Sequence, residues 1–192
     1  MAEPESCIRR HTALTSDLRS TITEVYAEVR ADLLDHPNYR VDVFLERLDR
    51  HADEPGWAAV MAYTLEGAAI GYAYANTIGP DDRWWKRMTV PAAPRFTARD
   101  TVAVKEIGVT PAHRGVGLAR RMHDALLDGR RERYATLMVN PAAGDGKVMR
   151  LYEGWGYREI GAVRPGAEAP WLVCMGRSVR MSDTFPLPGS EE

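Results

Sequence analysis

The residue types best placed to do chemistry lie where a predicted strand gives way to a predicted helix. The strand-like run 102–109 is followed by Arg114, Gly115 and Gly117, and an amphipathic helix pattern begins directly after them. Unpaired backbone N–H groups and the positive end of the helix dipole collect at such a helix start. The segment therefore predicts a binding site for a phosphate-bearing ligand.

Two familiar phosphate-binding motifs fit this segment less well. A nucleotide P-loop ends in Gly-Lys-Ser or Gly-Lys-Thr, whereas Gly117 is followed by Leu118 and Ala119. A dinucleotide fingerprint needs Gly or Ala at its last position, where this chain has Arg120. It also needs an acidic residue after a second strand, and none stands at the expected distance.

A carboxylate, Glu106, lies within the same predicted strand. Val104 and Gly108 share its face of the strand, because side chains alternate between faces. A carboxylate among apolar strand residues tends to have a raised pKa, which suits a general base. The alternative interpretation is a structural carboxylate that pairs with an arginine.

A second short pattern, LYEGWGY, occupies residues 151–157. Together with Arg114, Gly117 and Ala119, which follow Val109 and Pro111, it resembles the motifs of the GNAT superfamily of acyl-CoA N-acyltransferases. The two motifs stand in the family's order and at roughly its usual distance. The resemblance extends over about residues 7–178, although only these two stretches are specific.

The resemblance implies acetyl-CoA as co-substrate and assigns roles to particular residues. The family's pyrophosphate-binding loop corresponds to residues 114–120, and the backbone N–H of Val109 would polarise the thioester carbonyl. Glu106 would be the general base, and Tyr152 would protonate the departing thiolate. The expected coenzyme A contacts are Ile107, Val109, Arg114, Gly115, Val116, Gly117, Leu118, Ala119 and Arg120.

Several residues allow two interpretations. Tyr152 could instead be a core tyrosine on an apolar helix face. Asn140 and Asp145 each correspond only loosely to a family asparagine, because residues 141–146 look like an insertion. Residues 84–85, both tryptophan, could line an acceptor site or anchor a loop to the core. The sequence leaves these alternatives open.

The resemblance implies an N-acetyltransferase that acts on a primary amine of a small molecule, by direct attack in a ternary complex. No G-x-S-x-G elbow is present, so a covalent intermediate on the enzyme is not expected. Two alternatives are a protein acetyltransferase, acting on an N-terminus or a lysine, and a non-catalytic module that binds acyl-CoA. The chain would be a monomer or a homodimer.

Composition argues against several other classes of protein. The 192 residues are 45% hydrophobic and 27% charged, which is ordinary for one globular domain. The net charge of −2 gives the protein no overall attraction for nucleic acid or acidic membranes. No signal peptide or apolar run of membrane-spanning length is evident, and the two cysteines form no framework. We therefore expect a cytoplasmic protein without a metal, a nucleic-acid partner or a membrane partner.

Hydrophobic periodicity predicts a mixed α/β layered domain in the order β-α-α-β-β-β-α-β-α-β-β. The resemblance implies the same order, in a single GNAT-like domain over residues 7–178 between flexible segments 1–6 and 179–192. It further implies a mostly antiparallel six- to seven-stranded sheet with helices on both faces. Residues 79–99 are expected to be irregular. The expected strands are 7–11, 57–65, 69–77, 101–110, 134–140, 157–163 and 171–175, and the expected helices are 18–33, 41–48, one after Gly117, and 147–154.

Overall fold

The computed structural model describes residues 6–164 and 170–180. The strands are β1 (Cys7–His11), β2 (Ala58–Tyr63), β3 (Ala69–Ile78), β4 (Thr101–Val109), β5 (Tyr134–Val139), β6 (Arg158–Val163) and β7 (Leu172–Ser178). The α-helices are α1 (Ser16–Val29), α2 (Val41–Ala52), α3 (Arg83–Lys86), α4 (Pro94–Thr97), α5 (Leu118–Leu127) and α6 (Lys147–Gly154). Short 3-10 helices cover Ala31–Leu33, Pro37–Tyr39 and Pro111–His113.

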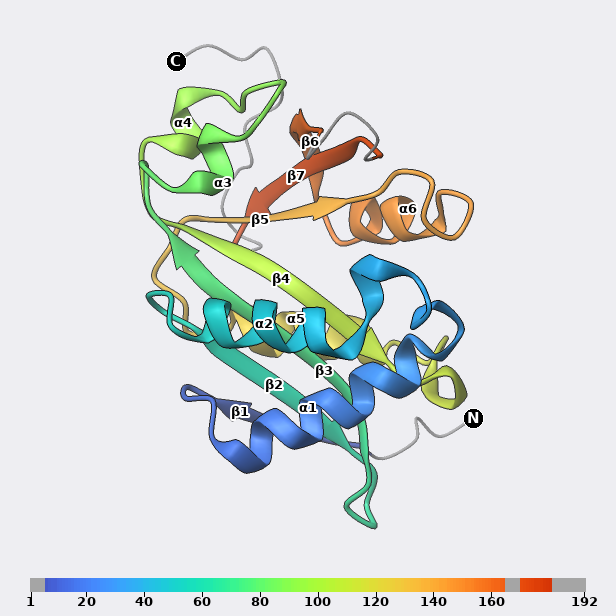
Figure 1. Ribbon diagram of the computed structural model, residues 1–192. Coiled ribbons are helices and arrows are strands. Elements are labelled where there is room, and N and C mark those ends of the chain that lie inside the picture. Colours follow the sequence, from blue (N-terminus) through green and yellow to red (C-terminus); the bar gives the residue numbers. More distant parts are fainter. Residues whose placement is uncertain (1–5, 165–169, 181–192) are drawn as a thin grey trace. The chain divides into compact units, whose positions relative to one another are not determined.

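The strands form one sheet in the order β1-β2-β3-β4-β5-β7-β6 (Figure 1). The pairs β1–β2, β2–β3, β5–β7 and β6–β7 are antiparallel, and β4 pairs with β5 in parallel. This arrangement confirms the predicted mixed α/β fold with a mostly antiparallel sheet. The expected single-domain boundaries stay a prediction.

The chain divides into two compact units, and each is described separately. The first contains the described residues of Met1–Asn76 and Val104–Asp128, and the second contains those of Thr77–Ala103 and Gly129–Glu192. Strands β3 and β4 contribute residues to both units.

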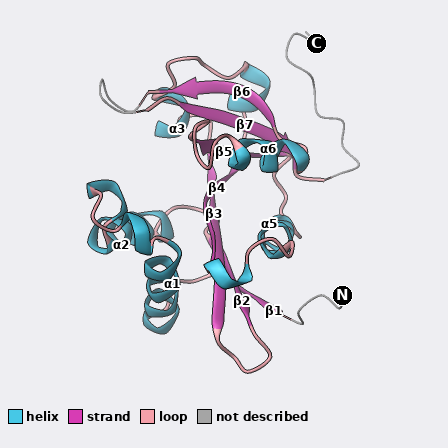
Figure 2. Cartoon of the chain, turned by 90° about the vertical axis from the view of Figure 1, so that its right-hand side faces the viewer, coloured by secondary structure: helices cyan, strands magenta, loops and turns pink. Residues whose placement is uncertain are grey.

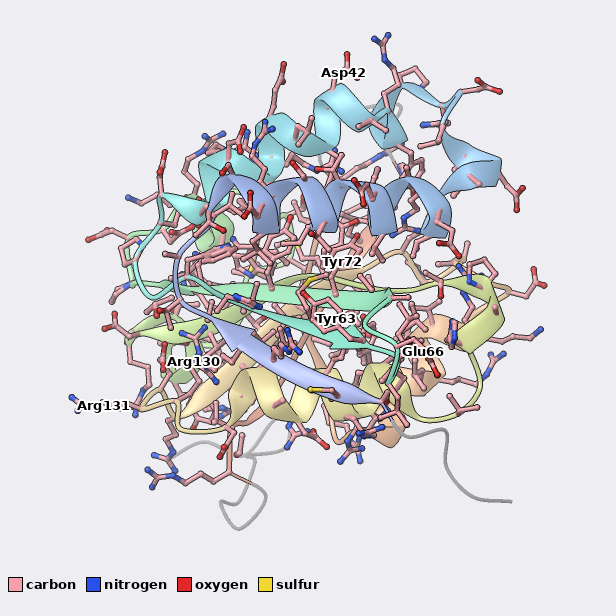
Figure 3. All side chains as sticks on the ribbon, turned by 90° about the horizontal axis from the view of Figure 1, so that it is seen from below. Asp42, Tyr63, Glu66, Tyr72, Arg130 and Arg131 are labelled. Carbon is pink, nitrogen blue, oxygen red and sulfur yellow. The ribbon has the colours of Figure 1, made fainter. Side chains whose placement is uncertain are left out.

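In the first unit, α1 and α2 cover one face of the strands and α5 covers the other (Figures 1 and 2). Helix α1 is capped by Thr15, whose hydroxyl accepts a 3.2 Å hydrogen bond from the Leu18 N–H. Its buried stripe packs toward the strands, with Tyr26 stacked on Phe44 of α2 at 3.7 Å between ring centroids. Tyr72 of β3 lies on the side of the strands that these two helices cover (Figure 3).

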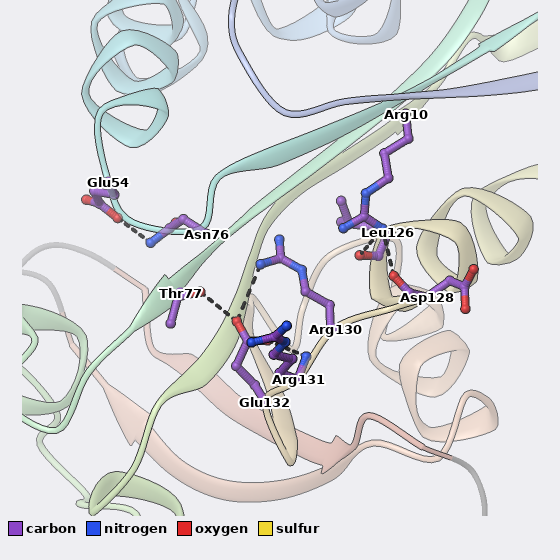
Figure 4. A network of polar contacts seen from close by, with 9 residues as sticks. All are labelled: Arg10, Glu54, Asn76, Thr77, Leu126, Asp128, Arg130, Arg131 and Glu132. Carbon is purple, nitrogen blue, oxygen red and sulfur yellow. Dashed lines mark hydrogen bonds and ion pairs between the residues drawn. The ribbon is translucent and has the colours of Figure 1, made fainter.

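Helix α5 is fixed at its C-terminal end by an arginine from β1. The Arg10 guanidinium donates hydrogen bonds to the carbonyl oxygens of Leu126 and Asp128, at 3.4 and 2.8 Å (Figure 4). It also donates to the carbonyl oxygen of Ala125 at 2.9 Å. A cation at this end also compensates the negative end of the helix dipole.

The second unit has its own apolar core. Trp85 of α3 and Phe96 of α4 are buried there together with Tyr134 and Cys174, and Trp84 packs against the same cluster. This packing favours the anchoring interpretation of the two tryptophans. A polar contact lies near the start of β5, where the Thr77 hydroxyl donates a 2.6 Å hydrogen bond to Glu132 (Figure 4).

Several boundaries differ from the sequence expectations. Helix α1 ends at Val29, four residues before the predicted end at Leu33. The prediction was too long because the apolar spacing continues past the point where the chain turns. Leu33 itself lies in a 3-10 helix and is 42% exposed. The segment 79–99 was expected to be irregular but contains the one-turn helices α3 and α4. Of the two segments expected to be flexible, 1–6 and 179–192, residues 1–5 and 181–192 lie outside the described residues.

Candidate active site

Strand β4 places the Glu106 carboxylate in a largely enclosed position within the first unit. The side chain is 13% exposed. Its Oε2 accepts a 3.5 Å hydrogen bond from the hydroxyl of Tyr74, and its Oε1 lies 3.6 Å from Nη2 of Arg30. Both interpretations offered by the sequence are therefore present, since the carboxylate is buried and also faces an arginine.

Burial raises the pKa of Glu106 above its ordinary value, and the charges of Arg30 and Arg47 oppose that rise. The pKa values of Tyr72 and Tyr74 lie well above the ordinary tyrosine value, mainly because of burial and secondly because of the neighbouring carboxylate. Both phenols therefore stay neutral around neutral pH. A carboxylate with a raised pKa, beside neutral hydroxyls, is chemically suited to accept a proton.

His51 of α2 adds a neutral ring to this group. Its Nδ1 lies 3.4 Å from the Tyr74 hydroxyl. Burial, followed by the charges of Lys105, Arg50 and Arg47, lowers its pKa to about 3. The imidazole is therefore uncharged at neutral pH and contributes no positive charge near Glu106.

The two arginines beside Glu106 were missed by the sequence analysis. Arg30 follows the last residue of α1, and its guanidinium carbon lies 5.2 Å from the centroid of the Tyr39 ring. Arg47 of α2 donates a 3.0 Å hydrogen bond to the carbonyl of Asn38. No local pattern could reveal that these residues come close to a carboxylate far along the chain. The alternating tyrosines of β3 indicated only which face of the strand is buried near Glu106.

The loop after β4 contains the predicted anion-binding backbone. Gly115 and Gly117 have φ values of +81° and +78°, a region that other residues adopt at a cost. Gly117 is the N-cap of α5 and provides no side-chain hydrogen bond to the helix. The N–H groups of the first turn of α5 therefore have neither an intrahelical acceptor nor a capping side chain from Gly117. Val116, between the two glycines, is 42% exposed.

The arginine side chains of this loop are turned to the protein itself. Arg114 donates from Nε to the carbonyl of Val109 at 3.0 Å and from Nη2 to the carbonyl of Val29 at 3.2 Å. Arg120 forms an ion pair with Asp124 at 2.8 Å, one turn later in α5. Main-chain N–H groups of the loop, including those at residues 118–120 in the first turn of α5, are thus better placed than these side chains to bind an anion.

The remaining predicted residues lie at the end of β4 and in the second unit. Val109 is 8% exposed and is the last residue of β4, two positions after Ile107. Tyr152 lies on α6, in the second unit, with edge-on ring contacts to Trp155 and Tyr157 at 5.3 and 5.8 Å between centroids. Tyr152 is only partly buried and Leu151 beside it is 46% exposed, so these ring contacts do not make Tyr152 a core residue.

Local hydrogen bonds between side chains and the backbone hold the loop before α6. The Asn140 carboxamide oxygen accepts a 2.9 Å hydrogen bond from the Ala142 N–H, which makes a local turn. Asp145 has a φ of +56°, and its carbonyl accepts a 3.1 Å hydrogen bond from Arg150. The Asn140 side chain is thus engaged in a local turn.

Among the described residues, no group of three or more His, Cys, Asp or Glu side chains is arranged to hold a metal ion. Within the same part of the chain, no helix combines the length and hydrophobicity needed to cross a membrane.

Comparisons with known proteins identify a family and a shared fold. The family model described as "Acetyltransferase (GNAT) family" matches residues 20–157, more than half of the chain. A search of curated proteins found no significant match. Many solved structures share the fold, with identities low enough that the likeness concerns the fold alone.

Three of these structures illustrate the range of neighbours. The ribosomal-protein-S18-alanine N-acetyltransferase from Escherichia coli superposes with a TM-score of 0.60 at 14% identity, over 95% of this chain and 99% of the other. Arabidopsis thaliana NAA60 in complex with acetyl-CoA gives 0.60 at 13%, over 91% and 98%. Mutant forms of the spermidine/spermine N-acetyltransferase SpeG from Vibrio cholerae give 0.55 at 16%, over 91% and 95%.

Proposed function

The chain belongs to the GNAT family of acetyltransferases, which use acetyl-CoA as co-substrate, and from that premise we propose that it acetylates a primary amine of a small molecule. The observation that carries the proposal is the burial of Glu106 on the strand that leads directly into the Gly115–Gly117 turn. One element thus presents a proton acceptor and is followed by a set of anion-binding N–H groups.

The reaction proceeds by direct attack in a ternary complex. Glu106 accepts a proton from the ammonium group, directly or through water, and the amine lone pair attacks the thioester carbonyl carbon. The Val109 N–H stabilises the oxygen on which negative charge develops. The carbon–sulfur bond then breaks, the attacking nitrogen loses its second proton, and the coenzyme A thiolate gains one. The products are the amide and the free thiol, and the proton held by Glu106 passes to solvent.

The role of Tyr152 as the proton donor to the thiolate rests on its position in the second family motif. A thiol has a pKa near 8.5, so a weak acid such as a phenol is sufficient to protonate the leaving group. The neighbouring NAA60 structure is a complex with acetyl-CoA, which supports acetyl-CoA as the co-substrate here, and the loop at residues 114–120 is assigned to its pyrophosphate from the first family motif. The backbone N–H groups of Gly115 to Arg120 would provide most of that contact.

The test is an assay of thiol release from acetyl-CoA with a panel of small amines. We expect release with at least one amine and none without an acceptor. Tyr152→Phe should reduce turnover while leaving the dissociation constant for coenzyme A within about twofold. Acetylation of peptides but of no small amine would contradict the small-molecule acceptor, and tight acetyl-CoA binding without turnover on either would indicate a binding module.

A further inference from the structure

The charges around Glu106 are predominantly positive. Arg30 lies against the carboxylate, and Arg47 is close enough to lower its pKa. Lys105, adjacent on β4, has a side chain that is only 7% exposed. The second carboxylate nearby, Glu54, is already engaged, 3.7 Å from Lys105 and hydrogen-bonded to Asn76 at 2.5 Å (Figure 4).

The Arg30 guanidinium is not saturated by its protein contacts. Its ion pair with Glu106, at 3.6 Å, is longer than the 2.7–2.9 Å of a good charge-assisted hydrogen bond. Its Nε is buried and has no hydrogen-bond partner among the described residues. A guanidinium has five N–H donors. The enclosed Nε is closed to a ligand, but the Arg30 side chain as a whole is 29% exposed, so the outer part of the guanidinium can donate to an anion.

We propose that the acceptor is a zwitterionic amine, in which the reacting amine lies a few bonds from a carboxylate or phosphate, as in a free amino acid. The proposal rests on the proposed function, in which the amine approaches Glu106. The pair Glu106 and Arg30 presents a negative and a positive group 3.6 Å apart. An ammonium group and an anion on neighbouring carbons have the complementary arrangement, with the ammonium at Glu106 and the anion at Arg30.

This arrangement discriminates against two other acceptor classes. A polyamine would bring additional positive charges close to Arg30 and Arg47, and like charges repel strongly where burial reduces screening. The N-terminus of a protein has its α-carboxyl group in a peptide bond and would leave Arg30 without an anion. Free zwitterions satisfy both members of the pair.

The experiment compares matched acceptors by thiol release from acetyl-CoA. Each set contains an amino acid, its α-amide and its decarboxylated amine, with aliphatic, aromatic and acidic side chains represented; phosphoethanolamine and spermidine complete the panel. Values of kcat/KM are referred to the unprotonated amine, so that basicity does not decide the order. We expect the amino acid or phosphoethanolamine to exceed the α-amide and the decarboxylated amine by about tenfold or more, as expected for one charge-assisted hydrogen bond.

A preference for the amino acid would identify the anion as a carboxylate, and a preference for phosphoethanolamine would identify it as a phosphate. Equal values of kcat/KM within each set, or a preference for spermidine, would overturn the zwitterion proposal and leave the acetyltransferase function intact. An absence of thiol release with every amine would instead contradict the proposed function.

A binding measurement decides the proposal even without turnover. Calorimetry on protein saturated with coenzyme A should show heat from the preferred amino acid or phosphoethanolamine and at least tenfold weaker binding of the matched uncharged compound. Equal binding, or no binding of any zwitterion, would overturn the proposal.

Substitution of Arg30 links the preference to the site. Arg30→Gln should reduce the ratio of kcat/KM between the zwitterion and its uncharged analogue about tenfold, and Arg30→Lys should retain part of it. Arg40→Gln is the matched control, because Arg40 pairs with Asp42 at the surface, where both side chains are 59% exposed. A ratio that Arg30→Gln leaves unchanged, with coenzyme A affinity also unchanged, would refute the role of Arg30. A loss confined to coenzyme A affinity would refute it equally, because Arg30 would then serve the cofactor.

Discussion

Nη2 of Arg114 donates a 3.2 Å hydrogen bond to the carbonyl oxygen of Val29, the last residue of α1. The same guanidinium donates from Nε to Val109, the last residue of β4. Arg114 therefore links the loop after β4 to the end of α1, and the residue that follows Val29 is Arg30, which faces Glu106. The arginine of the loop motif thus forms a structural connection within the first unit.

Replacement of Arg114 by lysine tests this connection. Lysine retains the charge but cannot present two N–H donors in a fixed planar geometry. We expect Arg114→Lys to lower the free energy of unfolding by about 1 kcal/mol and to weaken coenzyme A binding through a less ordered loop. Thermal unfolding and calorimetry measure the two effects. Wild-type stability and affinity in this variant would indicate that only the charge of Arg114 matters.

Gly117→Ala should strain the loop without a steric clash. A Cβ atom at this position would meet nothing within 4 Å, so the cost arises from the φ of +78° alone. We expect a loss of about 1 kcal/mol in stability and weaker coenzyme A binding. Gly154→Ala is the control, because that glycine lies in α6, also has no neighbour within 4 Å, and has no positive φ. A control that destabilises as much as Gly117→Ala would contradict the backbone explanation.

Gly108→Ala should disturb the packing beneath Glu106. An added Cβ would lie 2.6 Å from Cε1 of Tyr72, a side chain that is fully buried. We expect a loss of about 1–3 kcal/mol, because a rigid ring in a packed core cannot move aside cheaply. Chemical denaturation measures the loss. At Gly79 the nearest atom would be 3.6 Å away, so Gly79→Ala should cost clearly less.

The pH dependence of stability should report the buried carboxylate. The folded-state pKa of Glu106 is raised above its ordinary value of 4.5, so the folded protein holds this proton more tightly than the unfolded chain does. This contribution stabilises the protein below pH 4.5 and is lost as the pH rises through the folded-state pKa. A glutamine side chain carries no titrating proton, so Glu106→Gln has no such contribution to lose as the pH rises. The stability of this variant relative to wild type should therefore increase with pH above 4.5. A difference independent of pH would show that Glu106 titrates alike in both states.

Local patterns were enough for most elements of the fold. The predicted helix 147–154 coincides with α6, and the strand 7–11 coincides with β1, because spacing and turn residues mark their ends. The motif glycines also predicted the turn before α5. The environment of Glu106 was not predictable, since Arg30 and Tyr74 reach it only after distant segments pack together. Apolar spacing likewise continued to Leu33, whereas tertiary packing ended α1 at Val29.

The most direct test of the proposed chemistry is the turnover of Glu106→Gln, measured together with its dissociation constant for acetyl-CoA. The substitution preserves the shape of the side chain and removes its ability to accept a proton. We predict that kcat falls by about 10²-fold or more at neutral pH, as expected for loss of a general base, while acetyl-CoA binding changes by less than about twofold. An unchanged kcat in a folded variant that binds acetyl-CoA normally would contradict the assignment of Glu106 as the base.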